Sequence, residues 1–141
     1  MMSHLRRYLF LQQLQLLVLL SATIEAGVRP RAHVRIINNL RPDLNLIIHC
    51  KSKNADVGTH LILYEQNFEV DFTLNFWGTT LYFCSMAWKY SLEYFYIYIQ
   101  DRDQRLCKVY VWSIRATGLC MFNYKTGKYI CYGWNPPLAL N

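Results

Sequence analysis

Apolar and polar residues alternate along much of the chain, in short segments separated by turn-forming residues. The clearest case is Phe68–Leu74, where Phe68, Val70, Phe72 and Leu74 are apolar and the residues between them are polar. Because side chains of a strand point to opposite faces in turn, this segment predicts a strand with one buried and one solvated face. Eight further segments are rich in aromatic and β-branched residues and also predict strands: Ala32–Ile37, Leu44–Cys50, His60–Tyr64, Thr79–Met86, Tyr94–Gln100, Lys108–Arg115, Leu119–Tyr124 and Lys128–Tyr132.

The spacing of these segments predicts the fold class. Short strands at roughly 8–12-residue intervals, with turn clusters between them, are typical of an all-β sandwich or barrel. We expect a single antiparallel β-sandwich domain of about eight or nine short strands with little helix. Turn-forming residues at 38–43 predict a hairpin between Ala32–Ile37 and Leu44–Cys50. Residues 123–128, which include Gly127, predict a second and tighter hairpin.

One predicted strand carries a row of tyrosines. In Tyr94–Gln100 the phenylalanine and the isoleucines fall on one face, and Tyr94, Tyr96 and Tyr98 fall on the other. The tyrosine face is either packed against neighbouring strands or open as a stacking platform for a sugar, a base or a peptide. Packing explains the pattern without a ligand.

The tryptophans divide between core and surface. Trp112 lies in a predicted strand and Trp77 lies beside Gly78, so we assign both to packing. Trp88 is followed by Lys89 and Tyr90 in a predicted loop. We therefore expect Trp88 to be an exposed contact of the kind that dominates interfaces.

The first 26 residues have the organisation of a signal peptide. The basic pair Arg6 and Arg7 precedes an apolar stretch, Tyr8–Leu20, which is followed by small residues at Ala22 and Ala26. The stretch is shorter than the roughly 20 apolar residues that a permanent membrane span needs. We expect cleavage after Ala26, with Ala22 as the alternative, and no membrane-spanning segment in the cleaved protein.

Cleavage would leave residues 27–141 as one secreted domain, long enough for a modest core. The full chain has a net charge of +6 with histidine neutral, and the removed part carries Arg6, Arg7 and Glu25, so +5 remains. This charge favours acidic partners such as cell-wall polyanions, anionic lipids or acidic protein patches. It equally suits a soluble protein with no such partner.

All the cysteines lie after the signal peptide: Cys50, Cys84, Cys107, Cys120 and Cys131. In an oxidising compartment cysteines are expected to form disulfides. The tight hairpin at 123–128 would bring Cys120 and Cys131 close together. We therefore expect one bridge between them, which would stabilise the fold by roughly 2–4 kcal/mol.

Four stretches of the sequence carry a combination of residues found in a known family: Ile36–Leu40, His49–Lys53 followed by Gly58 and His60, Asn75–Cys84, and Cys107 with Trp112 and Gly118. With these motifs the chain resembles the plant self-incompatibility S-protein homologues from about Val34 to Trp134. The ending from Gly118 through Cys120 and Cys131 to Trp134 is similar to a subgroup that has an extra cysteine pair.

The resemblance implies a small secreted plant β-sandwich that needs no cofactor. Founding members of the family are stigma ligands that a pollen-surface receptor recognises, which leads to rejection of self pollen. We therefore expect an extracellular protein ligand in cell–cell recognition or signalling, with a cell-surface receptor as its partner and no role in binding nucleic acid.

One position departs from the family pattern. Tyr110 stands where the resemblance predicts a fourth shared cysteine, two residues before Trp112. One further bridge then forms between two of Cys50, Cys84 and Cys107, and one thiol is left over. Spacing does not determine which of the three is unpaired. We expect a buried free thiol, and the alternative is a covalent dimer.

An enzyme is the alternative from another class. Phosphodiester cleavage by a secreted ribonuclease needs two histidines, or a histidine and a carboxylate, near a basic residue. His49 and His60 flank a loop that could fold them together, and His33 is a third histidine of the secreted part. No paired-histidine motif is present, so we expect no catalysis. Adjacent strand residues such as His49 and Cys50 point to opposite faces, so we expect no metal site there either.

The loops are the expected places for partner contacts. The stretch 100–105 is the most charged part of the secreted chain and contains Asp101, Arg102, Asp103 and Arg105. We expect these four residues to contact the receptor, although the same pattern also fits a solvated loop. A membrane-active defence protein is the second functional alternative.

Overall fold

The computed structural model describes residues 1–27, 30–104 and 109–134. The chain forms two compact units, Met1–Pro30 and Arg31–Asn141. The first unit contains helix α1 (Met2–Gly27), which coincides with the predicted signal peptide. Within the described residues, no helix has the length and apolar character required to cross a membrane. Cleavage after Ala26 stays a prediction.

The described residues of the second unit form nine strands and one four-residue helix. Every predicted strand overlaps an observed one, so the all-β prediction is confirmed. The elements in chain order are β1 (Arg31–Asn38), β2 (Leu46–Lys51), β3 (Asp56–Ile62), β4 (Asn67–Thr73), β5 (Leu81–Trp88), β6 (Ser91–Ile99), α2 (Gln100–Asp103), β7 (Val109–Arg115), β8 (Gly118–Asn123) and β9 (Lys128–Tyr132).

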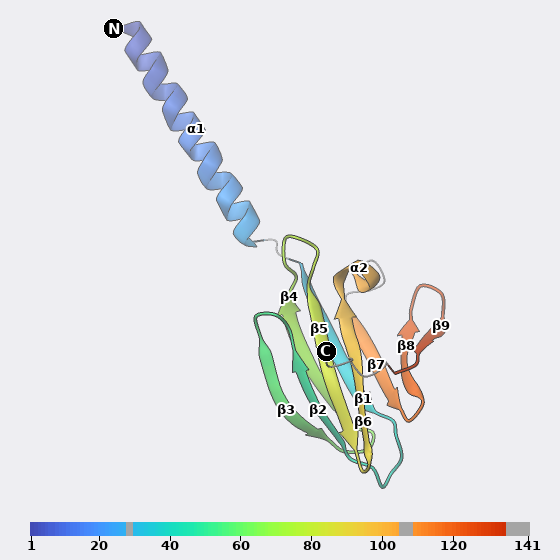
Figure 1. Ribbon diagram of the computed structural model, residues 1–141. Helices are drawn as coiled ribbons and strands as arrows, with labels where there is room; N and C mark the ends of the chain where they lie inside the picture. The colour runs from blue at the N-terminus through green and yellow to red at the C-terminus, as the bar shows by residue number, and fades with distance from the viewer. Residues whose placement is uncertain (28–29, 105–108, 135–141) are drawn as a thin grey trace, which may run out of the picture. The chain divides into compact units, whose positions relative to one another are not determined.

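The strands form two sheets that make a sandwich (Figure 1). One sheet has the order β4-β1-β7-β8-β9 and the other has the order β3-β2-β5-β6. Alternate residues of both sheets point inward and form one core, in which Ile36, Ile48, Trp112 and Ile114 are completely buried. This is the core of a two-layer sandwich, in which inward and outward residues alternate along each strand.

One strand pair departs from the antiparallel expectation. β1 and β7 run parallel, whereas the other strand pairs that the structure describes are antiparallel. Parallel neighbours need a long connection. Here β1 and β7 are separated in the sequence by β4 of the same sheet and by all four strands of the other sheet.

The predicted hairpin between the first two strands is wrong, because β1 and β2 belong to different sheets. Asn38 fixes the crossing between the layers and is completely buried. Its Nδ2 donates to the carbonyls of Leu44 at 2.8 Å and Ile62 at 2.9 Å. Its Oδ1 accepts from the amide of Leu40 at 3.0 Å. Turn-forming residues fit a crossing between sheets as well as a hairpin, so they did not distinguish the two.

A bulge in β6 interrupts the predicted tyrosine face. Tyr98 lies opposite Tyr82 and Tyr96 lies opposite Phe83, so one extra residue, Ile97, stands between them. As a result Ile97 and Tyr98 are both completely buried. Tyr98 is a core residue, and the predicted alternation fails at this point.

Both disulfides of the described residues join cysteines that lie directly opposite each other on neighbouring strands. Cys120 and Cys131 link β8 to β9, with 4.1 Å between their Cα atoms. Cys50 and Cys84 link β2 to β5, with 4.0 Å between their Cα atoms. The first bridge is the one expected from the hairpin, and the second identifies the other pair. Cys107 lies outside the described residues.

Candidate recognition surfaces

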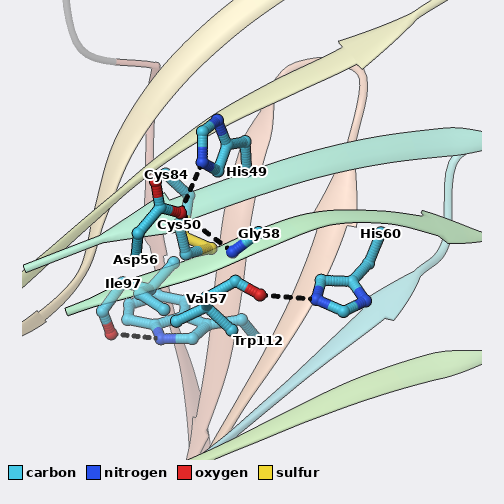
Figure 2. Close-up of a disulfide and its surroundings, with 9 residues drawn as sticks. All are labelled: His49, Cys50, Asp56, Val57, Gly58, His60, Cys84, Ile97 and Trp112. Atoms are coloured by element: carbon cyan, nitrogen blue, oxygen red, sulfur yellow. Dashed lines mark hydrogen bonds and ion pairs between the residues drawn. A yellow bond between two sulfur atoms is a disulfide. The ribbon is translucent and has the colours of Figure 1, made fainter.

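The β2–β3 ribbon places two of the candidate histidines on opposite faces (Figure 2). His49 points outward, where its Nε2 lies 2.6 Å from Oδ1 of Asp56. The amide of Gly58 donates to the same carboxylate at 2.9 Å. The Gly58 hydrogen bond, and then the His49 hydrogen bond, hold the pKa of Asp56 below its usual value. His49 and Asp56 therefore fix the base of the β2–β3 loop.

His60 lies on the inner side of the ribbon. Its Nε2 donates to the carbonyl of Val57 at 2.8 Å, and its ring stacks on Phe68 with 3.9 Å between ring centres. His33 is on the other sheet, where its Nδ1 lies 2.8 Å from the Asp71 carboxylate. The expectation that the loop could fold His49 and His60 together is therefore wrong. These positions do not form a two-histidine acid–base pair.

Two charged residues of α2, Arg102 and Asp103, form an ion pair at the edge of the core. The Asp103 side chain is completely buried and accepts two hydrogen bonds from Arg102, from Nε at 2.6 Å and from Nη2 at 2.8 Å. The backbone amide of Ile99 donates to the same carboxylate at 2.8 Å. A buried carboxylate needs such partners, because burying an unpaired charge is costly.

Arg102 is held by aromatic rings as well as by Asp103. Its guanidinium carbon lies 5.4 Å from the ring centre of Phe95, 5.4 Å from that of Trp112 and 5.3 Å from that of Tyr132. These distances are typical of cation–π contacts. The prediction that Asp103 contacts a receptor is wrong, and Arg102 serves mainly the interior.

For the other two charged residues of this segment, Asp101 and Arg105, contact with a receptor stays a prediction. Asp101 is exposed. Arg105 lies outside the described residues.

Trp88 is a buried residue, contrary to the expectation of an exposed contact. It is the last residue of β5, and only 7% of its surface is exposed. Its ring packs against Trp134 with 5.6 Å between centres. The strand continues two residues beyond the predicted end, and its alternation directs Trp88 inward. The exposed aromatic residue of the following turn is Tyr90, at 95%.

Trp77 shows the opposite error, because it is exposed although the sequence indicated packing. It lies in the loop between β4 and β5, 81% exposed, beside Phe76, which is 86% exposed. The two rings contact each other edge to face, with 5.6 Å between ring centres. Gly78 follows with a φ of 73°, a turn conformation that favours glycine. We call Phe76 and Trp77 the aromatic tip. Its sequence signal was the pair of large rings between turn-forming residues.

Hydrogen bonds hold the loop that carries the aromatic tip. The Asn75 side chain donates to the Thr79 hydroxyl at 2.9 Å and accepts from the Thr79 amide at 3.0 Å. The Asn75 amide donates to the Thr80 hydroxyl at 2.7 Å. The Thr80 amide donates to the Gln100 side chain at 3.1 Å, which ties the loop to α2. The loop therefore presents its two rings on an ordered backbone.

A cleft of about 260 Å³ lies next to this loop. Lys53 and Asn54 of the β2–β3 loop line one part, and Asn75 and Thr79 line another. The β2–β3 loop, the β4–β5 loop and α2 thus gather at one end of the sandwich (Figure 1). This end combines exposed aromatic rings, a basic side chain and hydrogen-bonding groups, which is a composition suited to protein recognition.

Known proteins are similar to this chain over most of its length. The sequence model described as plant self-incompatibility protein S1 matches residues 33–134. S-protein homolog 20 of Arabidopsis thaliana is 41% identical over 113 residues, which cover 79% of this chain and 80% of the relative. S-protein homolog 19 of the same plant is 38% identical over 103 residues, which cover 73% and 76%.

A solved structure has the same fold. It is described as one of the SPH (self-incompatibility protein homologue) proteins, a widespread family of small, highly stable, secreted proteins from plants. The TM-score is 0.53 at 21% identity, and the match covers 77% of this chain and 92% of the other.

Proposed function

The chain belongs to the plant self-incompatibility protein S1 family, and we propose from this premise that it is a secreted ligand for a cell-surface protein. It would act in extracellular recognition or signalling of the self-incompatibility type. The signal-peptide organisation of the first 26 residues supports secretion. The two disulfides support the same conclusion, because disulfides form and persist in an oxidising compartment such as the extracellular space.

The aromatic tip is the observation that carries the proposed binding role. Tryptophan is enriched among the few residues that supply most of the energy of an interface. Phe76 and Trp77 are both more than four-fifths exposed and their rings contact each other, so they form a contiguous apolar patch of the kind that marks interaction sites. Because hydrogen bonds through Asn75 and Thr80 order their loop, little conformational freedom would be lost on binding.

Saturable binding to plant cells tests this function. The full chain with a C-terminal tag is expressed in plant cells, and the protein recovered from the medium is expected to begin at Gly27. Labelled protein should bind protoplasts to a plateau, and unlabelled protein should displace it. Binding that rises without a plateau, and that unlabelled protein does not displace, contradicts a specific receptor.

Two further assays separate the ligand from the other functional classes. Incubation with RNA at neutral pH is expected to leave the RNA intact, whereas cleavage that His49→Ala abolishes would favour a ribonuclease. Anionic vesicles loaded with dye are expected to retain it, whereas leakage would favour a membrane-active defence protein. Capture of plasma-membrane proteins on the tagged domain would then identify the receptor.

A further inference from the structure

A second exposed surface lies on the outer face of the five-stranded sheet, apart from the aromatic tip. A hollow of about 380 Å³ there is lined by Ile37 of β1 and Val111 of β7, with aromatic residues of the β8–β9 hairpin beside them. Those aromatic residues are Phe122, Tyr124 and Tyr129. We call this hollow the hairpin groove. Its lining is therefore mainly apolar and aromatic.

The aromatic rings of the β8–β9 hairpin are held in place by contacts with one another. Phe122 contacts Tyr124 and Tyr129 edge to face, with 4.9 Å and 5.1 Å between ring centres. Tyr124 and Tyr129 are nevertheless 68% and 62% exposed. The Cys120–Cys131 disulfide joins the two strands of the hairpin, so the rings stand on a cross-linked support.

The charge around the hairpin groove has a single sign. Residues 109–134 contain Arg115, Lys125 and Lys128 and no aspartate or glutamate. On the same sheet, the Glu69 carboxylate pairs with His33 and Arg35, and the Asp71 carboxylate pairs with His33.

Arg115 lines the groove itself. Its Nε lies 3.5 Å from the Ser113 hydroxyl, and no carboxylate of the described residues pairs with its guanidinium. An arginine of this kind is a site for a carboxylate from outside the chain. The groove therefore offers an apolar surface and a cation side by side.

We propose that the hairpin groove binds an acidic segment of the partner protein that also carries an apolar or aromatic side chain. The apolar side chain packs against Ile37 and Val111 between the hairpin rings, and a carboxylate pairs with Arg115. The proposal rests on the ligand function and adds a second contact to it. Ile37 and Val111 give the groove an aliphatic patch, which suits an apolar side chain better than the hydroxyls of an anionic polysaccharide.

Synthetic polymers test the chemistry without knowledge of the receptor. Fluorescence anisotropy compares three labelled probes with the secreted protein: a random copolymer of glutamate and tyrosine, polyglutamate, and polygalacturonate. We expect the copolymer to bind at least tenfold more tightly than either of the other two. Equal affinity for all three would mean that charge alone drives binding, and it would overturn the proposal.

Two pairs of matched variants locate the binding. Arg115→Glu should weaken copolymer binding at least tenfold, whereas Arg31→Glu, the same substitution at the exposed first residue of β1, should weaken it less than threefold. Tyr129→Ser should weaken binding at least fivefold, whereas Tyr90→Ser should not change it. These side chains are exposed, so circular dichroism should show that all four variants fold. Equal losses within either pair would overturn the assignment to the groove.

The cell-binding assay separates this proposal from the ligand function. If Arg115→Glu binds protoplasts as tightly as the unchanged protein, the groove is not a partner site, and the ligand function still stands. If the unchanged protein shows no saturable binding to cells, the ligand function fails, and so does the claim that a partner protein supplies the acidic segment.

Discussion

The Tyr110 hydroxyl donates a hydrogen bond to the backbone carbonyl of Asp103 across 2.8 Å. Tyr110 is only 1% exposed, and its ring meets that of Tyr98 edge to face at 5.3 Å between centres. Tyr110 occupies the position where the family resemblance predicts a fourth shared cysteine. The Tyr110 phenol therefore anchors α2, and the chain has five cysteines, an odd number.

The odd cysteine gives the first prediction. Cys50, Cys84, Cys120 and Cys131 are used in two bridges, which leaves Cys107 as the fifth cysteine. Thiol titration of the denatured, unreduced protein should return one group per chain, and Cys107→Ser should return none. A titre of zero for the unchanged protein, together with a dimer on a non-reducing gel, would show an intermolecular disulfide instead.

Asn38 gives a prediction about the joining of the two sheets. Asn38→Ala would leave the buried carbonyls of Leu44 and Ile62 without their donor and the Leu40 amide without its acceptor. The free energy of unfolding should fall by about 2–4 kcal/mol in a urea titration. Asn45→Ala, at the exposed position immediately before β2, should change it by less than about 0.5 kcal/mol. Similar losses of unfolding free energy in the two variants would contradict the role of Asn38 in joining the sheets.

The Arg102–Asp103 pair predicts a graded loss of stability. Arg102→Ala would leave a buried carboxylate without its cation, so the free energy of unfolding should fall by about 3–5 kcal/mol. Arg102→Lys keeps the charge but loses the bidentate hydrogen bond and the planar group that stacks on the rings. Its free energy of unfolding should therefore lie between those of the unchanged protein and Arg102→Ala. Asp101→Ala is the control, because Asp101 is exposed. A lysine variant as stable as the unchanged protein would show that the aromatic rings contribute little.

Asp56 predicts how stability depends on pH. Its hydrogen bonds from the Gly58 amide and from His49 lower its pKa in the folded state below the usual value of an aspartate. The carboxylate therefore stabilises the fold above about pH 4, and this contribution is lost as the pH falls through the folded pKa. The difference in melting temperature between the unchanged protein and Asp56→Asn should be full near neutral pH and shrink below about pH 4. A difference that grows on acidification would contradict this sign.

Local pattern was sufficient to predict the strands. In β4 the apolar residues Val70 and Phe72 are buried and their polar neighbours Glu69 and Asp71 are exposed, as the alternation indicated. The Cys120–Cys131 bridge also followed from a local hairpin. These features depend on residues close in the sequence, where side-chain direction and turn chemistry decide the outcome.

Features that depend on distant residues were not predictable in the same way. Asp103 looked like a surface charge because the rings around its partner Arg102 come from Phe95, Trp112 and Tyr132, on three different strands. The opposite errors at Trp77 and Trp88 have a related cause. Composition shows neither where a strand ends nor which face its last residue joins, so a residue assigned to a loop can belong to a strand and face the core, as Trp88 does.

Binding of aromatic-tip variants to plant cells tests the central claim most directly. The measurement compares the Phe76→Ser/Trp77→Ser double variant with Tyr90→Ser, which removes an equally exposed ring from the β5–β6 turn. All three side chains are outside the core, so melting temperatures should stay close to that of the unchanged protein.

We expect the double variant to lose at least tenfold in affinity for protoplasts, since two hot-spot rings are removed, and Tyr90→Ser to bind normally. A double variant that folds and binds cells as tightly as the unchanged protein would contradict recognition through the aromatic tip.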